Sequence, residues 1–261
     1  MIHRVLGILL QEFYITRRSL EVIVDLFFFS VLSLLAFGFV YLFLGQENST
    51  LAGKYLLLGL IFWEVIRICQ FSVTVGALWN IWARNLSNMF ITPLSVSEYL
   101  FALILSGTIK SLIVFFLVSF ISLFLFHFNV FQIGAVTLVF SFINLAIFSW
   151  SFGIFMLGLI FRFGTRIQAL AWGLVFVLQP LSATFFPVKI LPPAMQVLAY
   201  SLPTTHVFEM ARNSLNNTQV NWAAIGIAFA ENIFYFALAL WVFSRLFAKS
   251  KESGQFARNE G

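Results

Sequence analysis

The chain has 261 residues, of which 61% are hydrophobic and only 10% are charged. Its apolar runs leave no room for a separate soluble domain of ordinary size, about 100 residues or more, so we expect a single membrane domain over residues 1–261. The net charge of +5 comes from basic residues scattered through loops and tails. That scatter excludes the basic, aromatic-lined groove that nucleic-acid binding requires, and we expect no nucleic-acid partner.

Six long apolar runs alternate with short polar joints. The hydrocarbon core of a bilayer is about 30 Å thick, and a helix needs roughly 20 apolar residues to cross it. The pattern therefore predicts an all-α integral membrane protein. The expected transmembrane helices are residues 24–44, 55–80, 98–126, 131–161, 168–187 and 222–247.

The distribution of Lys and Arg predicts the orientation of these spans. With both termini in the cytoplasm, ten basic residues lie on the cytoplasmic side and only Lys54, Lys189 and Arg212 lie outside. Cytoplasmic loops carry an excess of basic residues, so we expect this N-in, C-in arrangement within a membrane domain at 24–247. Residues 248–261 then form a cytoplasmic tail.

The segment 1–22 has the pattern of an amphipathic helix. Apolar residues recur at helical spacing at Ile2, Val5, Leu6, Leu9 and Phe13. Such a helix lies in the membrane interface, with lipid as its partner and its basic residues toward anionic headgroups. Its polar face could also contact a cytoplasmic partner.

The joint between the second and third spans predicts a short helix at 83–91. Pro93 ends any helix that precedes it, and Ser95 with Glu98 fits a capping box that starts the third span. Apolar anchors on a short cytoplasmic helix suit a groove on a partner protein, whereas a tight solvated loop is the alternative. The candidate contact residues, which we expect to be exposed, are Arg84, Asn85, Leu86, Asn88, Met89 and Phe90, together with Ile91.

The joint between the fifth and sixth spans, 187–221, is too short and too interrupted by proline to cross the membrane. Pro193 predicts the start of one short helix, and Thr204 or Thr205 could cap a second. Irregular backbone at membrane depth must be buried in protein or line a wet cavity. We therefore expect a pair of re-entrant helices on the outer side.

Several polar residues fall within the predicted spans. Glu64 and Arg67 lie three positions apart, on one face of a helix, and can pair. Intramembrane charges are costly and usually face the bundle interior or a wet pathway. We take Glu64, Arg67 and Gln179 as pathway candidates, with a purely structural role as the alternative.

The sequence lacks the patterns that catalysis would need. It has no Gly-x-x-x-x-Gly-Lys-Ser/Thr phosphate loop, no His-Glu-x-x-His and no Gly-x-Ser-x-Gly. We therefore expect no catalytic residues, no metal site and no cofactor on this chain.

Three segments resemble the membrane subunits of ABC-2 type exporters, the permeases of polysaccharide, lipooligosaccharide and drug export systems. The cytoplasmic joint 84–98 resembles the family's "sPls..e" region. Residues 182–192 resemble "sG.fFP...lP", with Ala183 in place of the usual glycine, and residues 202–212 resemble "lPlth.ve..R". The sequence is most similar to the nodulation-factor exporter permeases.

The resemblance implies a permease in the plasma (inner) membrane that pairs with a second permease chain, expected to be a homodimer, above two ATP-binding subunits. Those partners would hold ATP–Mg and carry out hydrolysis. The segment 83–91 would be the coupling helix, and Phe185, Phe186 and Pro187 would belong to an outer gate. The expected substrate is amphipathic and lipid-linked or glycan-bearing. A drug or small-lipid exporter of the same fold, or a non-transporting membrane scaffold, is the alternative.

Overall fold

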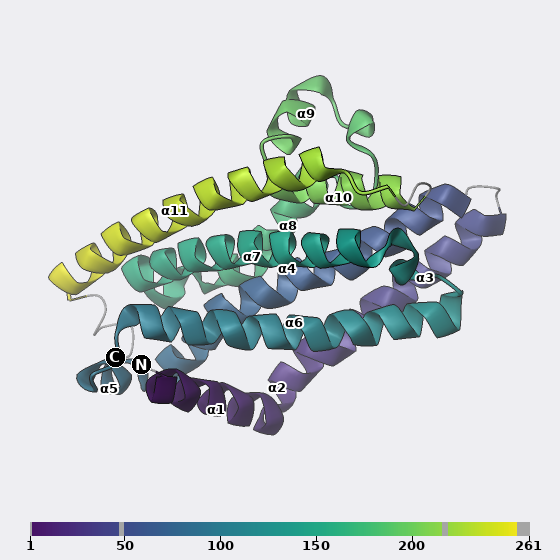
Figure 1. Ribbon diagram of the computed structural model, residues 1–261. Helices are drawn as coiled ribbons and strands as arrows, with labels where there is room; N and C mark the ends of the chain where they lie inside the picture. The colour runs from purple at the N-terminus through teal and green to yellow at the C-terminus, as the bar shows by residue number, and fades with distance from the viewer. Residues whose placement is uncertain (1, 47–49, 216–218, 255–261) are drawn as a thin grey trace.

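The computed structural model describes residues 2–46, 50–215 and 219–254, and this part is predominantly helical, with no strand (Figure 1). The N-terminal half contains α1 (Ile2–Arg18), α2 (Leu20–Ile23), a π-helical turn (Val24–Phe28), α3 (Phe29–Gln46), α4 (Thr50–Trp82), α5 (Leu86–Ile91) and α6 (Val96–Phe126). The C-terminal half contains α7 (Ala135–Phe163), α8 (Gln168–Leu181), α9 (Pro193–Ala199), α10 (Pro203–Ser214) and α11 (Trp222–Glu252), with short 3₁₀ turns at Val130–Ile133, Gly164–Ile167 and Val188–Ile190.

Five helical stretches in the described residues are long and apolar enough to cross a membrane. Four coincide with predicted spans, at Leu20–Gln46, Thr50–Trp82, Val96–Phe126 and Trp222–Glu252. The fifth, Ala135–Leu181, covers two predicted spans and bends where Gly164 adopts a positive φ of 76°. Its second part, α8, has 14 residues and rises only about 21 Å, so the count of six spans stays a prediction.

The predicted span at 168–187 is wrong at its C-terminal end. The helix α8 stops at Leu181, and Ala183 adopts a left-handed φ of 49°. A left-handed residue cannot continue a right-handed helix, so the chain turns there instead of running on to Pro187.

The helix α4 is the centre of the fold and packs against α3, α6, α7 and α8. Its apolar window is 94% buried, against 22% for the first and last spans. Small residues let its neighbours approach closely. A Cβ atom on Gly107 of α6 would lie 2.8 Å from the Ser72 Cβ atom, and one on Gly153 of α7 would lie 2.9 Å from the Val73 Cβ atom.

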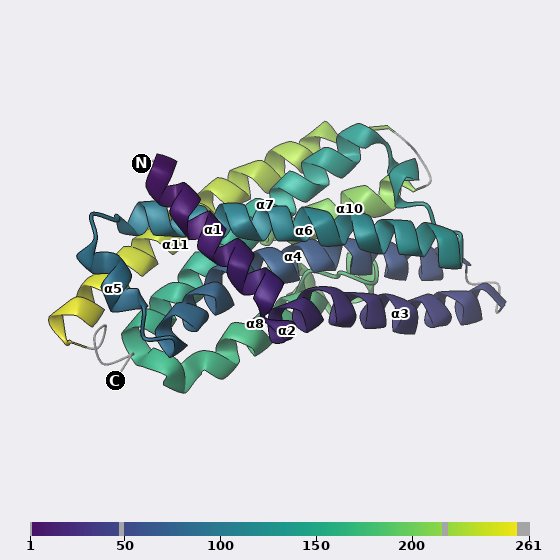
Figure 2. The ribbon, with the colours of Figure 1, turned by 90° about the horizontal axis from the view of Figure 1, so that it is seen from below.

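The amphipathic helix α1 crosses α6 diagonally (Figure 2). Its buried residues are Val5, Ile8 and Glu12, whereas Leu6 and Phe13 are exposed. The predicted apolar stripe is thus divided between two faces, because the bundle buries one side of α1 and leaves the other side exposed.

The α1 helix, the α5 helix and the C-terminal end of α11 lie at one end of the bundle (Figure 1). The C-terminal end of α3, the N-terminal end of α4 and the turn between α6 and α7 lie at the other end. This arrangement agrees with termini on a common side of the membrane, while the cytoplasmic assignment of that side stays a prediction.

Candidate functional site

A buried charge cluster joins α3 and α4 within the membrane-spanning part of the fold. The guanidinium of Arg67 donates to Glu64 Oε2 at 2.8 Å and to the Ser30 hydroxyl at 2.8 Å. The Ser30 hydroxyl also lies 2.6 Å from Glu64 Oε2. Glu64 and Arg67 therefore form the predicted pair, and Ser30 of α3 completes it.

Asp25 is a further member of this cluster and was not among the predicted site residues. Arg67 lies 3.4 Å from its carboxylate and donates to its backbone carbonyl at 3.2 Å. Asp25 sits in the π-helical turn Val24–Phe28, and such turns occur often at functional sites. The sequence did contain a signal for Asp25, because a carboxylate within a long apolar run is energetically costly in a membrane and therefore indicates a functional or paired residue.

The three predicted pathway residues line one cavity of about 380 Å³. Glu64 and Arg67 come from α4, and Gln179 comes from α8. Most of the remaining wall is aromatic, and it includes Phe29, Phe37, Trp63, Phe71, Trp172 and Phe176. The structure thus gathers Glu64, Arg67 and Gln179 at one place, although this does not by itself assign them a role in transport.

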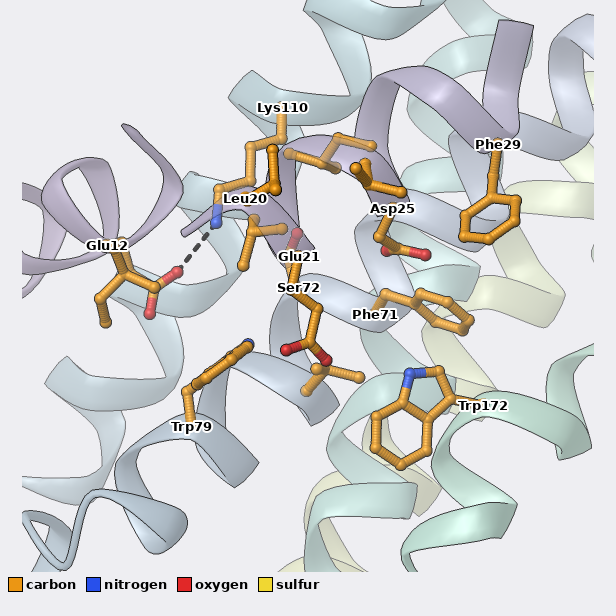
Figure 3. Close-up of a pocket in the computed structure, with 16 residues that line it drawn as sticks. Glu12, Leu20, Glu21, Asp25, Phe29, Phe71, Ser72, Trp79, Lys110 and Trp172 are labelled. Atoms are coloured by element: carbon orange, nitrogen blue, oxygen red, sulfur yellow. Dashed lines mark hydrogen bonds and ion pairs between the residues drawn. The ribbon is translucent and has the colours of Figure 1, made fainter. Parts of the chain in front are cut away.

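A larger cavity of about 540 Å³ adjoins the first (Figure 3). The two cavities share Asp25, Phe29, Phe71 and Trp172. The larger one extends toward α1 and α6, and Glu12, Glu21, Trp79 and Lys110 also line it. Together the cavities form a lining of charged, aromatic and aliphatic side chains between the N-terminal segment, α4 and α8.

Polar contacts hold α1 against the bundle beside this lining. Lys110 Nζ lies 2.9 Å from Glu12 Oε2, and the Glu12 side chain is buried. Gln11 donates to Asn80 Oδ1 at 2.6 Å. Arg4 pairs with Glu98 at 2.9 Å and donates to the carbonyl of Pro93, in the joint that leads into α6.

The joint after α4 contains the predicted short helix, but its length and exposure differ from the prediction. The helix α5 has six residues and begins at Leu86, because Arg84 is left-handed, with φ of 53°, and Asn85 occupies the N-cap position. Leu86 is fully buried, so the expectation that its side chain is exposed is wrong. Its side chain anchors α5 on the apolar cluster formed by α4, α6 and α7.

Other members of the predicted contact set are available to a partner. Arg84 and Asn88 are exposed, and Asn85, Met89 and Phe90 are partly exposed. Ile91 presents 82% of its surface. The face of the joint that could receive a partner is therefore made by Arg84, Asn88 and Ile91.

At the other end of the bundle, a buried arginine organises the turn after α8. Arg212 is 2% exposed and donates to the carbonyls of Ala183 at 2.8 Å and Thr184 at 3.2 Å. It also pairs with Glu209 at 3.0 Å, and Glu209 accepts the backbone N–H of Val188 at 2.8 Å. The turn from Ala183 to Val188 is thus tied to α10.

The same turn lies directly against α4. A Cβ atom on Gly59 would meet the carbonyl oxygen of Thr184 at 2.2 Å, so only glycine permits this approach. Ala183 carries a side chain at a left-handed position where a glycine would be unstrained. This conformation favours glycine, which is the residue that the resemblance leads us to expect at position 183.

The three predicted outer-gate residues are partly buried in this region. Phe185 stacks on Phe37 of α3 with ring centroids 5.0 Å apart, and Phe186 packs on the small cluster around Ala183 and Val188. Pro187 precedes the 3₁₀ turn. The helix α10 begins at Pro203 rather than being capped by Thr204 or Thr205, which are buried within it.

The α10 helix packs against α7 and α11, while α9 stands away from the bundle (Figure 1). The two helices therefore do not form one closely packed pair. Their re-entrant placement in a membrane stays a prediction.

The described residues contain no group of three or more His, Cys, Asp or Glu side chains that could hold a metal ion. The remaining intramembrane amides are structural in their contacts. Asn232 donates to Asn144 Oδ1 at 2.9 Å and so joins α11 to α7, and Gln70 donates to the carbonyl of Ala171 and so joins α4 to α8.

Comparison with known proteins agrees with this architecture. The family model described as "ABC-2 type transporter" matches residues 4–216, which is most of the chain. No curated protein matches the sequence. The family match and the apolar helices indicate a multi-pass membrane protein that serves as a transport component. The chain belongs to the ABC-2 type transporter family, whose membrane permeases generally work with an ATP-binding subunit.

Proposed function

We propose that this chain is the transmembrane permease subunit of an ATP-driven ABC exporter. Two copies would form an outward pathway for an amphipathic substrate in the plasma (inner) membrane, with six spans each, and two separate ATP-binding subunits would dock at the end that carries α5. The observation that supports this most is the pair of adjoining cavities beside α4, which combine charged groups with an aromatic wall.

The docking surface would be the joint at 83–91, where Arg84, Asn88 and Ile91 are exposed. Buried Leu86 fixes this joint to the bundle, and Arg4 links the residues that follow it to α1. A displacement of the joint would therefore reach α1. It would then reach the larger cavity, because Glu12 and Ile15 of α1 line it.

The outward end of the pathway would lie near the turn that contains Phe185, Phe186 and Pro187. Phe37 supports this placement, since it lines the smaller cavity and stacks on Phe185. Opening an exit there would require the Phe37–Phe185 stack to separate, while Arg212 keeps the backbone of the turn in place.

The proposal is tested by affinity purification of the tagged chain from native membranes, with ATPase activity assayed on the eluate. Ile91→Asp places a charge on the exposed docking face. Ile190→Asp is the matched control, because Ile190 is 69% exposed in the segment between α8 and α9. We expect the ATP-binding subunit to accompany the wild type and the control and to be lost with Ile91→Asp.

Two results would overturn parts of this proposal. Equal recovery of the ATPase with both variants would remove the docking assignment of α5. If the wild-type chain came from intact membranes with no ATP-binding subunit, the exporter function would fail and a scaffold role would replace it.

A further inference from the structure

The walls of the two adjoining cavities carry an excess of negative charge. Four carboxylates and two cations line them, which gives a net charge of −2 with all six groups ionised. The carboxylates are Glu12, Glu21, Asp25 and Glu64, and the cations are Lys110 and Arg67.

This excess is concentrated on one stretch of the chain. Lys110 is paired with Glu12 at 2.9 Å, and Arg67 is paired with Glu64 at 2.8 Å. Asp25 has only the longer 3.4 Å contact with the same Arg67, and Glu21 has no ion-pair partner among the described residues. Glu21 and Asp25 lie four positions apart, and both line the larger cavity.

Aromatic side chains surround these two carboxylates. Phe29, Phe71, Trp79 and Trp172 line the same cavity (Figure 3). The face of an aromatic ring attracts a cation, and tryptophan does so most strongly. Two carboxylates that cations do not fully neutralise, beside aromatic rings, are thus complementary to an organic cation and repel an anionic headgroup.

The smaller cavity is suited to the apolar body of such a ligand. Phe37, Trp63 and Phe176 line it, and Asp25 lies on the boundary between the two cavities. The indole N–H of Trp63 has no hydrogen-bond partner among the described residues, although the side chain is only 2% exposed. A ligand that carries an oxygen acceptor in its body could satisfy this buried donor.

We propose that the adjoining cavities bind an amphipathic organic cation, with its charged group at Glu21 and Asp25 and its apolar body along the smaller cavity. This inference rests on the proposed permease function and narrows its substrate class. It favours a cationic drug-like molecule or an aminated lipid over a lipid that bears phosphate.

The test compares tetraphenylphosphonium with tetraphenylborate, which share shape and size and differ in the sign of their charge. Binding is measured on the complex of the chain with its ATP-binding subunit in nanodiscs, after subtraction of the signal from empty nanodiscs. We expect tetraphenylphosphonium to bind at least tenfold more tightly than tetraphenylborate. Glu21→Gln and Asp25→Asn should each weaken cation binding about tenfold, as expected for loss of one partly screened charge contact.

The control is Glu252→Gln, which removes an exposed carboxylate at the end of α11 and should leave cation binding unchanged. Glu21 is exposed, so its substitution leaves the fold intact even if Asp25→Asn disturbs the Arg67 contact. Equal binding of the two ions, or cation binding that is indifferent to Glu21→Gln, would overturn the inference. If the inference on the ligand fails but the ATP-binding subunit still copurifies, the proposed permease function stands. If the subunit never copurifies, the permease function fails, whatever the ligand-binding result.

Discussion

The buried ion pair between α1 and α6 yields the sharpest prediction about stability. Glu12 is almost fully buried, whereas the Lys110 side chain retains 14% of its exposure. Lys110→Met leaves a buried carboxylate without its cation, and removal of one partner from such a pair costs about 3–5 kcal/mol. The partial exposure of Lys110 places the expected loss near the lower value, about 3 kcal/mol.

Glu12→Gln should cost less, about 1 kcal/mol. The amide oxygen of a glutamine can still accept a hydrogen bond from Lys110, whose flexible stem can also carry the ammonium toward water. The double variant should be more stable than Lys110→Met alone, because no orphaned carboxylate remains. The order of stability is therefore a stronger test than any single value.

Hydrogen exchange of the α1 amides measures this local opening directly. A loss of about 3 kcal/mol corresponds to exchange roughly 10²-fold faster in Lys110→Met, and about 1 kcal/mol to a few-fold change in Glu12→Gln. The α7–α11 contact, which holds the Asn144–Asn232 pair, should keep its protection. Exchange in the double variant that is faster than in Lys110→Met would refute the argument from an orphaned charge.

Three further substitutions test the turn after α8. Gly59→Ala should lower the unfolding temperature by an amount equivalent to about 2 kcal/mol, because the new Cβ atom overlaps the Thr184 carbonyl. Gly7→Ala is its control, because a Cβ atom on Gly7 meets open space. Ala183→Gly should raise the unfolding temperature by an amount equivalent to about 1 kcal/mol, because it removes the backbone strain of an alanine in the left-handed conformation. A lower unfolding temperature would contradict this strain. Arg212→Met should cost about 3 kcal/mol by scanning fluorimetry, since two buried carbonyls lose their donor; an unchanged transition would contradict its role in the turn.

The features that the sequence predicted correctly are those decided within one or two helical turns. The capping box of α6 formed as expected, with Ser95 Oγ accepting from the Glu98 backbone at 3.2 Å and Glu98 accepting from Ser95 at 2.9 Å. The pairing of Glu64 with Arg67 likewise follows from their spacing on one helix. Mean hydropathy, taken over stretches long enough to cross a membrane, was enough to locate the long helices.

The features that it could not predict depend on contacts between distant segments. Glu12 and Lys110 are 98 positions apart and meet only because α1 crosses α6. The approach of Asp25 to Arg67 depends on a π-helical turn, for which the sequence offers no periodic signal. A six-residue helix also has too few turns to define a face, so the burial of Leu86 is set by the bundle rather than by a pattern in α5 itself.

The way in which each segment is held bears on how the proposed transport could work. The first span is mostly exposed, and the polar contacts of Arg67 reinforce its packing on α4. In contrast, α7 and α11, besides the Asn144–Asn232 amide pair, pack through large aromatic side chains such as Phe161 and Phe243. Polar pairs can exchange partners with water or a bound ligand at little net cost, whereas separating packed aromatic rings forfeits their dispersion contacts. The same polar groups line the two cavities, so a cation that competes for Asp25 would act directly on the attachment of the first span to α4.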